Sequence, residues 1–141
     1  MHTKSAGFTL IELLVTLIIV GILASIAVPA YQDYVRRSAL TEATNDLANY
    51  RIAMEQFYQD NMTYASGTGC GAPLPAGSYF TFSCTLNGGG TGFTATATGS
   101  TSLTNGFSYT INDLNVEATT GLGVWGALPP DAGSTWIVAP S

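Results

Sequence analysis

The chain has 141 residues, of which 46% are hydrophobic and only 9% are charged, whereas an average globular domain is about 25% charged. Four basic and nine acidic residues give a net charge of −5, which argues against a general binder of nucleic-acid phosphates. The one histidine is His2, and two cysteines are too few for a cysteine zinc site. We therefore expect one domain, no enzymatic activity, no cofactor and no metal site.

The charges divide the chain into two zones near residue 61. The basic residues all precede it, and after it only three acidic residues remain. Glycine, threonine, serine and asparagine dominate the second zone, so its surface is polar but neutral. A cytosolic domain usually carries more mixed charge for solubility. The composition of this zone is typical of an exported protein.

The first zone begins with a long apolar segment, residues 8–30, in which Glu12 is the only charge. As a helix it would be roughly 35 Å long, enough to cross a hydrocarbon core. A removable signal peptide is the alternative, but this stretch is longer than a signal core and continues into another helical pattern. Pro29 removes a helical hydrogen bond, and Gly21 lies two turns before it. These two residues predict either an ordinary transmembrane kink or a hinge that lets the helix stretch when subunits pack.

The second helical pattern is an apolar stripe whose members recur every three or four residues. We predict that residues 8–61 form a single helix of roughly 80 Å, apolar all round in its first half and amphipathic in its second. The stripe is too short for a coiled coil by itself, so we expect it to pack on a sheet formed by the rest of the chain. Its members are Leu40, Ala43, Leu47, Tyr50, Met54 and Phe57.

After residue 61 the sequence changes to short alternating runs separated by glycine and proline. Residues 79–86, 93–98 and 107–111 alternate apolar and hydroxyl side chains, residues 87–90 predict a turn, and residues 114–118 are a candidate fourth strand. The predicted fold class is α+β, with the long N-terminal helix packed on a small antiparallel sheet of three to four strands.

Cys70 and Cys84 suit one disulfide. If they pair, the bond would tie the loop after the helix to the first long strand and contribute about 3 kcal/mol. Two buried free thiols are the alternative, which is less expected in an exported domain. Among the aromatic residues near the C-terminus, we expect Trp136 to pack within a strand-like segment, residues 135–138, while Trp125 stays unassigned.

The run Gly7-Phe8-Thr9-Leu10-Ile11-Glu12, with its short basic leader and the apolar helix after it, resembles the processing site of type IV pilins, and of the type IVa subclass in particular. The resemblance implies that a prepilin peptidase cuts between Gly7 and Phe8 and that Phe8 is then N-methylated. It divides the chain into a removed leader, residues 1–7; a transmembrane and filament-core helix, residues 8–31; its amphipathic continuation, residues 32–61; and a globular head, residues 62–141.

Glu12 is the strongest single candidate for a functional residue. An ionised carboxylate in hydrocarbon is costly and needs a cationic partner, yet residues 8–35 contain no lysine, arginine or histidine. The nearby cation is the amine that cleavage creates at Phe8, in the same subunit or in a neighbour. We predict pairing between subunits, which would fix their register during assembly. The alternative is that Glu12 only caps its own helix.

The resemblance implies a structural subunit of a bacterial type IV pilus, not an enzyme. Such a subunit is held in the inner membrane as a precursor and polymerised by membrane machinery into an extracellular filament of identical subunits, which serves adhesion, twitching motility and, in some systems, DNA uptake. Minor pilins and the pseudopilins of type II secretion share this N-terminus and are the alternatives. Residues 61–141 contain no lysine or arginine, which argues against DNA binding by the head.

Overall fold

The computed structural model describes residues 7–139. They form two compact units that meet between Val35 and Arg36. We call them the N-terminal unit and the globular unit. One helix, α1 (Leu10–Asn61), runs through both, so the prediction of a single long helix is confirmed apart from its first two residues. The helix is uninterrupted at Gly21 and Pro29, and a hinge at these positions stays a prediction.

Every residue of the N-terminal unit from 7 to 30 is exposed, including its large apolar side chains. Within α1, one window of 18 residues reaches a mean hydropathy of 2.7, and none of that window is buried. By length and composition, this helix could cross a membrane. The apolar surface of this unit is not covered by any described part of the chain.

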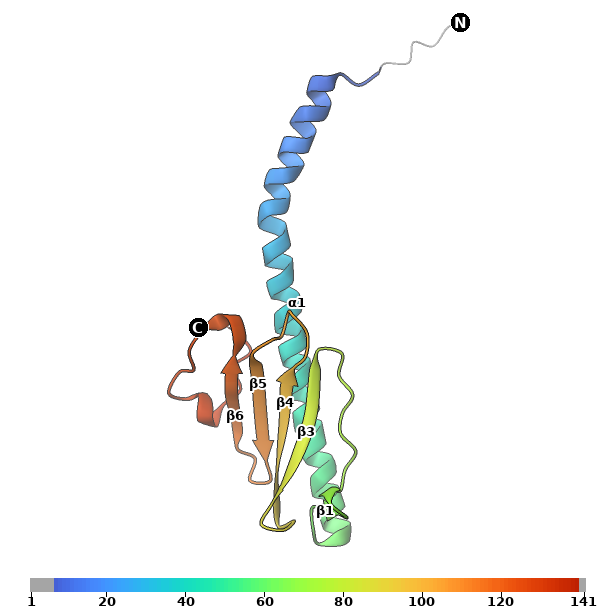
Figure 1. The fold of residues 1–141 in the computed structure, drawn as a ribbon, viewed down its shortest axis with the longest axis vertical. Helices are drawn as coiled ribbons and strands as arrows, with labels where there is room; N and C mark the ends of the chain where they lie inside the picture. The colour runs from blue at the N-terminus through green and yellow to red at the C-terminus, as the bar shows by residue number, and fades with distance from the viewer. Residues whose placement is uncertain (1–6, 140–141) are drawn as a thin grey trace, which may run out of the picture. The chain divides into compact units, whose positions relative to one another are not determined.

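The globular unit holds a four-stranded antiparallel sheet in the order β3-β4-β5-β6. Its strands are β3 (Phe80–Asn87), β4 (Gly92–Gly99), β5 (Phe107–Asn112) and β6 (Glu117–Leu122). Figure 1 shows the sheet lying across the second half of α1. The α+β class and the first three predicted strands are confirmed.

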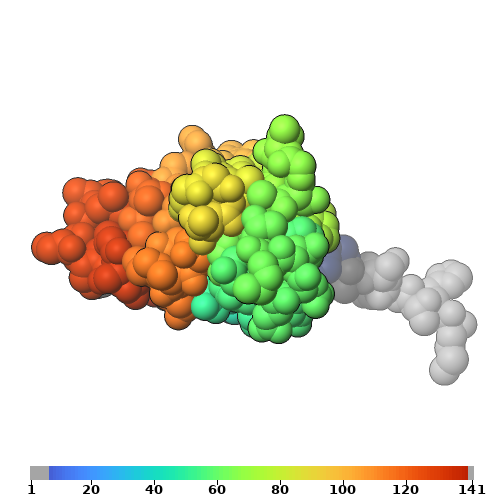
Figure 2. Space-filling model, turned by 90° about the horizontal axis from the view of Figure 1, so that it is seen from below, coloured from blue at the N-terminus to red at the C-terminus, as the bar shows by residue number. Residues whose placement is uncertain are grey.

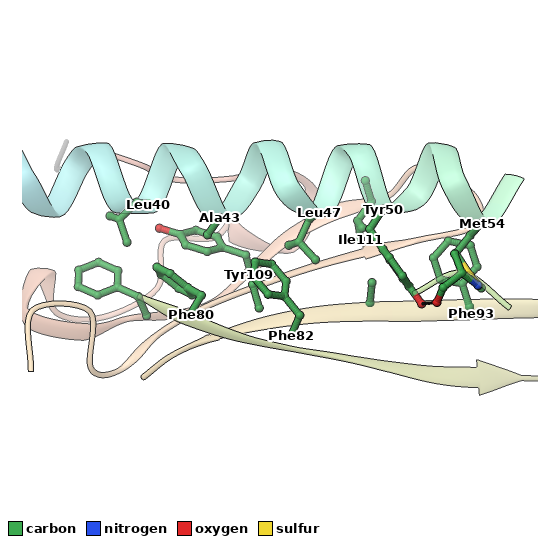
Figure 3. Close-up of a cluster of buried hydrophobic side chains, with 14 of the residues drawn as sticks. Leu40, Ala43, Leu47, Tyr50, Met54, Phe80, Phe82, Phe93, Tyr109 and Ile111 are labelled. Carbon is green, nitrogen blue, oxygen red and sulfur yellow. Dashed lines mark hydrogen bonds between the residues drawn. The ribbon is translucent and has the colours of Figure 1, made fainter. Parts of the chain in front are cut away.

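The core lies between the apolar stripe of α1 and the inward face of the sheet (Figure 3). Phe93 and Tyr109 are fully buried, and the ring of Tyr50 meets that of Phe93 edge to face, with 6.3 Å between ring centroids. Alternating positions of β3, β4 and β5 contribute the apolar side chains, as their period of two predicts. The buried stripe on the helix is Leu40, Ala43, Leu47, Tyr50 and Met54, with Phe57 half-buried at its end.

The fourth strand lies later than predicted. Residues 113–116 form a tight turn instead, because the Val116 amide donates to Oδ1 of Asn112 over 2.8 Å and Asn115 adopts a left-handed φ of 57°. Strand β6 therefore begins at Glu117. A β-bulge beside Ser108 then shifts the register between β5 and β6.

Two further features of the globular unit differ from the sequence-based expectations. Residues 135–138 form no strand; the indole of Trp136 packs on the core, and its Nε1 donates to the Thr110 carbonyl over 2.9 Å. A short hairpin that was not predicted, β1 (Ala65–Ser66) and β2 (Gly69–Cys70), follows the helix.

The chain just after α1 is fastened to the β3–β4 turn. The Tyr64 amide donates to the Gly90 carbonyl over 2.9 Å, and Oγ1 of Thr63 donates to the same oxygen over 3.2 Å. Figure 2 shows this end of the globular unit, where the segment after α1 (green) lies against the turn (yellow). The three glycines of the turn, Gly88, Gly89 and Gly90, all have positive φ, which other residues adopt only with strain.

Candidate functional site

The candidate site at the start of α1 contains the predicted cleavage point and Glu12. Phe8 is 88% exposed, and a Cβ added to Gly7 would meet no atom within 4 Å. The described fold therefore gives no steric reason for a glycine at position 7. A requirement for glycine there would come from another molecule, such as a peptidase that must bring its own groups close to the backbone.

Thr9 and Glu12 form a reciprocal cap on the first turn of α1. The Thr9 amide and its Oγ1 both donate to Oε2 of Glu12, over 2.9 and 2.8 Å, and the Glu12 amide donates back to Oγ1 of Thr9 over 3.3 Å. This is a capping box, in which the side chain of the third helical residue, Glu12, accepts from the backbone amide of Thr9, the residue that precedes the helix. The capping role, weighed as the alternative for Glu12, is thus present in the single chain.

The cap does not exclude a second role for Glu12. Both donated bonds end on Oε2, and none of the described residues donates a hydrogen bond to Oε1. Cleavage after Gly7 would leave the amide and hydroxyl of Thr9 in place, so the capping box could persist in a processed chain. The new amine would stand on Phe8, next to the capping residue. An assembly role for Glu12 stays a prediction.

The other polar side chains of the apolar segment are satisfied by its own backbone. Oγ1 of Thr16 donates to the carbonyls of Glu12 and Leu13 over 2.9 and 2.8 Å, and Oγ of Ser25 donates to the Ile22 carbonyl over 2.7 Å. Such bonds let hydroxyls lie in hydrocarbon at little cost. The carboxylate of Glu12 is therefore the group in this segment that most needs a partner from outside the chain.

The disulfide lies at the other end of the helix, where Cys70 of β2 is bonded to Cys84 of β3. The predicted pairing is confirmed. The segment beyond Cys70 is also tied to α1, because the Ala72 amide contacts Sδ of Met54 at 3.3 Å and the hydroxyl of Tyr50 reaches the Ala72 carbonyl at 3.4 Å. The disulfide thus fixes the loop after the helix to the sheet, and the Ala72 contacts fix it to the helix.

The sequence did not predict that two tyrosine hydroxyls have hydrogen-bond partners within the chain and raised pKa values. The ring of Tyr64 stacks on Tyr58 with centroids 4.6 Å apart, and its hydroxyl donates to Oε1 of Glu55 over 2.9 Å. Burial, reinforced by this hydrogen bond and the charge of Glu55, raises the pKa of Tyr64 to about 12. Burial likewise raises the pKa of Tyr109, whose hydroxyl donates to the Ile137 carbonyl over 2.8 Å.

The loop between β4 and β5 contains another arrangement that the sequence did not reveal. Thr104 is fully buried, and its Oγ1 donates to the Tyr79 carbonyl over 2.8 Å. Arg36, at the start of the globular unit, donates from Nε to the Leu103 carbonyl over 3.0 Å. Because these contacts join residues 25 and 67 positions apart, no local sequence pattern could have predicted them.

Comparison with known families identifies the family to which the chain belongs. Residues 2–28 match the prokaryotic N-terminal methylation motif. Residues 29–110, more than half of the chain, match the family described as type IV minor pilin ComP, DNA uptake sequence receptor. The chain belongs to the type IV pilins. Its N-terminal helix thus carries the methylation motif of this family, and most of its globular unit matches a pilin family model.

Individual relatives agree with the family. The pilin is 34% identical to the type IV major fimbrial protein FimA of Dichelobacter nodosus, in an alignment that covers 96% of this chain and 83% of FimA. It is 40% identical over 93 residues to the fimbrial protein EcpC of Eikenella corrodens, covering 65% of this chain and 61% of EcpC. It is also 40% identical to a type IV major pilin, PilE1 of Neisseria gonorrhoeae, covering 54% of this chain and 36% of PilE1. The pilin thus spans less than two thirds of the length of EcpC and PilE1.

Solved structures agree on the fold. A type IV pilin from Shewanella oneidensis superposes with a TM-score of 0.50 at 19% identity, covering 58% of this chain and 89% of that one. The non-core minor pilin PilV of Neisseria meningitidis superposes with a TM-score of 0.55 at 22% identity, covering 70% of this chain and 97% of PilV. At these identities the likeness supports the pilin fold.

Proposed function

We propose that this pilin is a structural subunit of a bacterial type IV pilus, stored in the inner membrane and polymerised through the first half of α1. The observation that carries the proposal is the contrast within one helix. Its second half buries one stripe under the sheet, while the described residues 7–30 are exposed and strongly apolar. Exposed apolar surface of this extent requires a bilayer before assembly and the helices of other subunits afterwards.

The proposal includes processing of the precursor. A prepilin peptidase would remove residues 1–7 and methylate the amine of Phe8, leaving a core helix of residues 8–31, its amphipathic continuation over residues 32–61, and the head of residues 62–141. The match of residues 2–28 to the methylation motif supports this step. An exposed Phe8 and an uncrowded Gly7 fit a backbone that another protein must reach.

Glu12 would guide assembly in this proposal. The amine of Phe8 on an incoming subunit would pair with the carboxylate of Glu12 on a subunit already in the filament, so that two charges leave hydrocarbon as one neutral pair. A single axial offset between neighbouring helices would allow this pairing, which would set the register. Gly21 and Pro29 would provide the hinge. The proposed partners are further copies of this chain, the peptidase and the inner-membrane assembly machinery.

Intact mass on material sheared from the cell surface tests the proposal. The leader contains both Lys4 and His2, the only lysine and histidine of the chain, so that processing also removes every lysine. We expect a species that begins at Phe8, carries one extra methyl group, lacks two hydrogens because of the disulfide, and exposes no lysine to amine-reactive reagents. An uncut chain in both the surface and the membrane fractions would contradict the proposal.

A minor pilin that binds DNA is the second candidate, because residues 29–110 match the family described as a DNA uptake sequence receptor. The charge distribution argues against it: the last basic residue of the chain is Arg51, and seven acidic residues lie from Glu42 onward. DNA affinity depends on neutralising phosphates with lysine and arginine. A gel-shift titration with duplex DNA, at low salt and then at rising salt, decides between a structural subunit and a DNA receptor. Binding that weakens steeply with salt would favour the DNA receptor.

A pseudopilin of type II secretion is the third candidate and shares the N-terminal motif. Location separates it from a pilus subunit. A processed chain that is abundant in sheared surface filaments supports the pilus, whereas a processed chain confined to the membrane fraction supports the pseudopilin or a scarce minor pilin. The adhesive, twitching and DNA-uptake roles of the filament follow only if the surface form is found.

A further inference from the structure

The outer face of the sheet, turned away from α1, is an ordered array of hydroxyl groups. On β3, β4 and β5 the outward positions alternate with the buried apolar ones. Strand pairing places them in rows: Thr81 opposite Thr98, Ser83 opposite Thr96, and, across β4, Thr96 opposite Thr110. We call this surface the hydroxyl face; its residues are Thr81, Ser83, Thr85, Thr94, Thr96, Thr98, Ser108, Thr110 and Asn112.

The hydroxyl face carries no charge, although the rest of the globular unit does. From Arg36 onward the chain has seven acidic and three basic residues, and none of them occupies an outward position on β3, β4 or β5. Glu117, on β6, pairs with the buried Ile111 and so belongs to the side of the sheet that faces the helix. Two negatively charged copies would therefore repel each other least if they met through the hydroxyl face.

The face is also open. In Figure 1 the sheet lies in front of α1, and no other segment of the globular unit crosses β3, β4 or β5 on that side. Thr81, Ser83, Thr85 and Thr98 are exposed. The C-terminal segment lies against β6 instead, where Oγ1 of Thr119 donates to the Thr135 carbonyl over 2.9 Å.

We propose that the hydroxyl face is a contact surface for a second copy of the same face in a neighbouring filament. Each hydroxyl both donates and accepts a hydrogen bond, so two such faces complement each other. Threonine is short and stiff about χ1, so little side-chain entropy is lost on contact, and twisted sheets pack face to face in many proteins. The inference rests on the proposed filament.

Symmetry and area assign this contact to neighbouring filaments. Contact between two identical faces requires a two-fold axis, which successive subunits of one polar helical filament do not provide. The nine residues of the hydroxyl face, three on each of three strands, span about 300 Å² at ordinary sheet spacings, well below the about 800 Å² per partner of a stable interface. A single pair of copies would therefore separate, whereas filaments that repeat the contact along their length would bind by avidity.

Lateral bundling of sheared filaments tests the inference, measured by low-speed sedimentation and electron microscopy. We expect wild-type filaments to bundle, and to bundle more as salt rises, because salt screens the repulsion between acidic copies. Thr96→Glu, at the centre of the face, should lower the sedimented fraction by about fivefold or more, since the loss repeats at every subunit. Thr110→Glu should do the same.

Thr68→Glu is the matched control, because Thr68 is exposed on the turn between β1 and β2, away from the hydroxyl face; it should bundle like wild type. Aromatic circular dichroism and filament length verify that the Thr96 and Thr110 variants fold and polymerise. Wild-type filaments that stay single at every salt concentration, unchanged bundling in both on-face variants, or glycans on these hydroxyls would overturn the inference. A failure to form any filament would instead count against the proposed function.

Discussion

The two units of this pilin use the same helix in opposite ways. In the globular unit, α1 buries one stripe against the sheet, and Leu40 and Met54 are completely covered. In the N-terminal unit the helix exposes every side chain up to residue 30, including Leu17 at 61%. The sequence of the globular unit is thus explained by contacts within the chain. The apolar surface of the N-terminal unit has no such contacts and calls for partners outside the chain.

Glu12 gives the clearest test of this difference. Its presence can be explained by the cap on Thr9 within the chain or by pairing with the amine of another subunit. Glu12→Ala removes both the cap and the charge, and we expect surface filaments to disappear while the head stays folded. Glu12→Gln keeps an oxygen that can accept from Thr9 but removes the charge. Thr9→Ala removes the capping hydroxyl but keeps the charge and the backbone amide that donates to Glu12. Filament yield from sheared cells is the measurement.

The charge-pairing account predicts that Glu12→Gln fails like Glu12→Ala, and that Thr9→Ala still assembles. The capping account predicts the reverse order. Loss of one cap costs about 1 kcal/mol, too little to abolish a filament held by a whole apolar helix. Normal filaments from Glu12→Gln would therefore refute the proposed role in register.

Leucine-to-alanine substitutions in the two units compare the halves of the helix directly. Leu47 is 1% exposed, so Leu47→Ala should lower the free energy of unfolding of the head by about 2–5 kcal/mol through lost burial and a cavity. Leu17→Ala should leave that free energy within about 0.5 kcal/mol. Urea unfolding of the detergent-solubilised chain, followed by aromatic circular dichroism, measures both. Equal effects would show that the two units do not unfold independently.

The disulfide gives the next effect in size. Cys70 and Cys84 are 14 positions apart, and opening a loop of this length should lower the free energy of unfolding by about 3 kcal/mol. The double variant Cys70→Ser/Cys84→Ser and the reduced wild-type chain should agree in urea midpoint. The Ala72 contacts to Met54 and Tyr50 should keep the reduced head folded. A reduced head that loses its aromatic dichroism without urea would contradict this expectation.

The sequence predicted those parts of the globular unit in which apolar residues recur with the period of a helix or a strand and so mark the buried face. The helical stripe from Leu40 to Met54 and the alternation on β3, β4 and β5 are of this kind, because one period decides which side chains are covered. The path of the C-terminal segment could not be predicted. It depends on a bond between Trp136 and the Thr110 carbonyl, 26 positions away, and on the turn that Asn112 closes before β6.

In the N-terminal unit the sequence was informative for a different reason. The apolar run and the lone Glu12 identify a segment that needs outside partners, and the structure adds the cap on Thr9. The assembly role of Glu12 and the hinge at Gly21 and Pro29 therefore depend on experiments with filaments.

The smallest predicted effect concerns alkaline pH and only the globular unit. Tyr64 has a folded-state pKa of about 12, above its ordinary value of about 10, so its contribution to stability is fully present below pH 10 and is lost as pH rises toward 12. Tyr64→Phe should flatten the fall in urea midpoint between pH 10 and 12. A slope remains, because burial also raises the pKa of Tyr109.

Tyr31→Phe, which changes an exposed tyrosine of the N-terminal unit, is the control and should leave the slope unchanged. An equal change in both variants would refute the assignment to Tyr64.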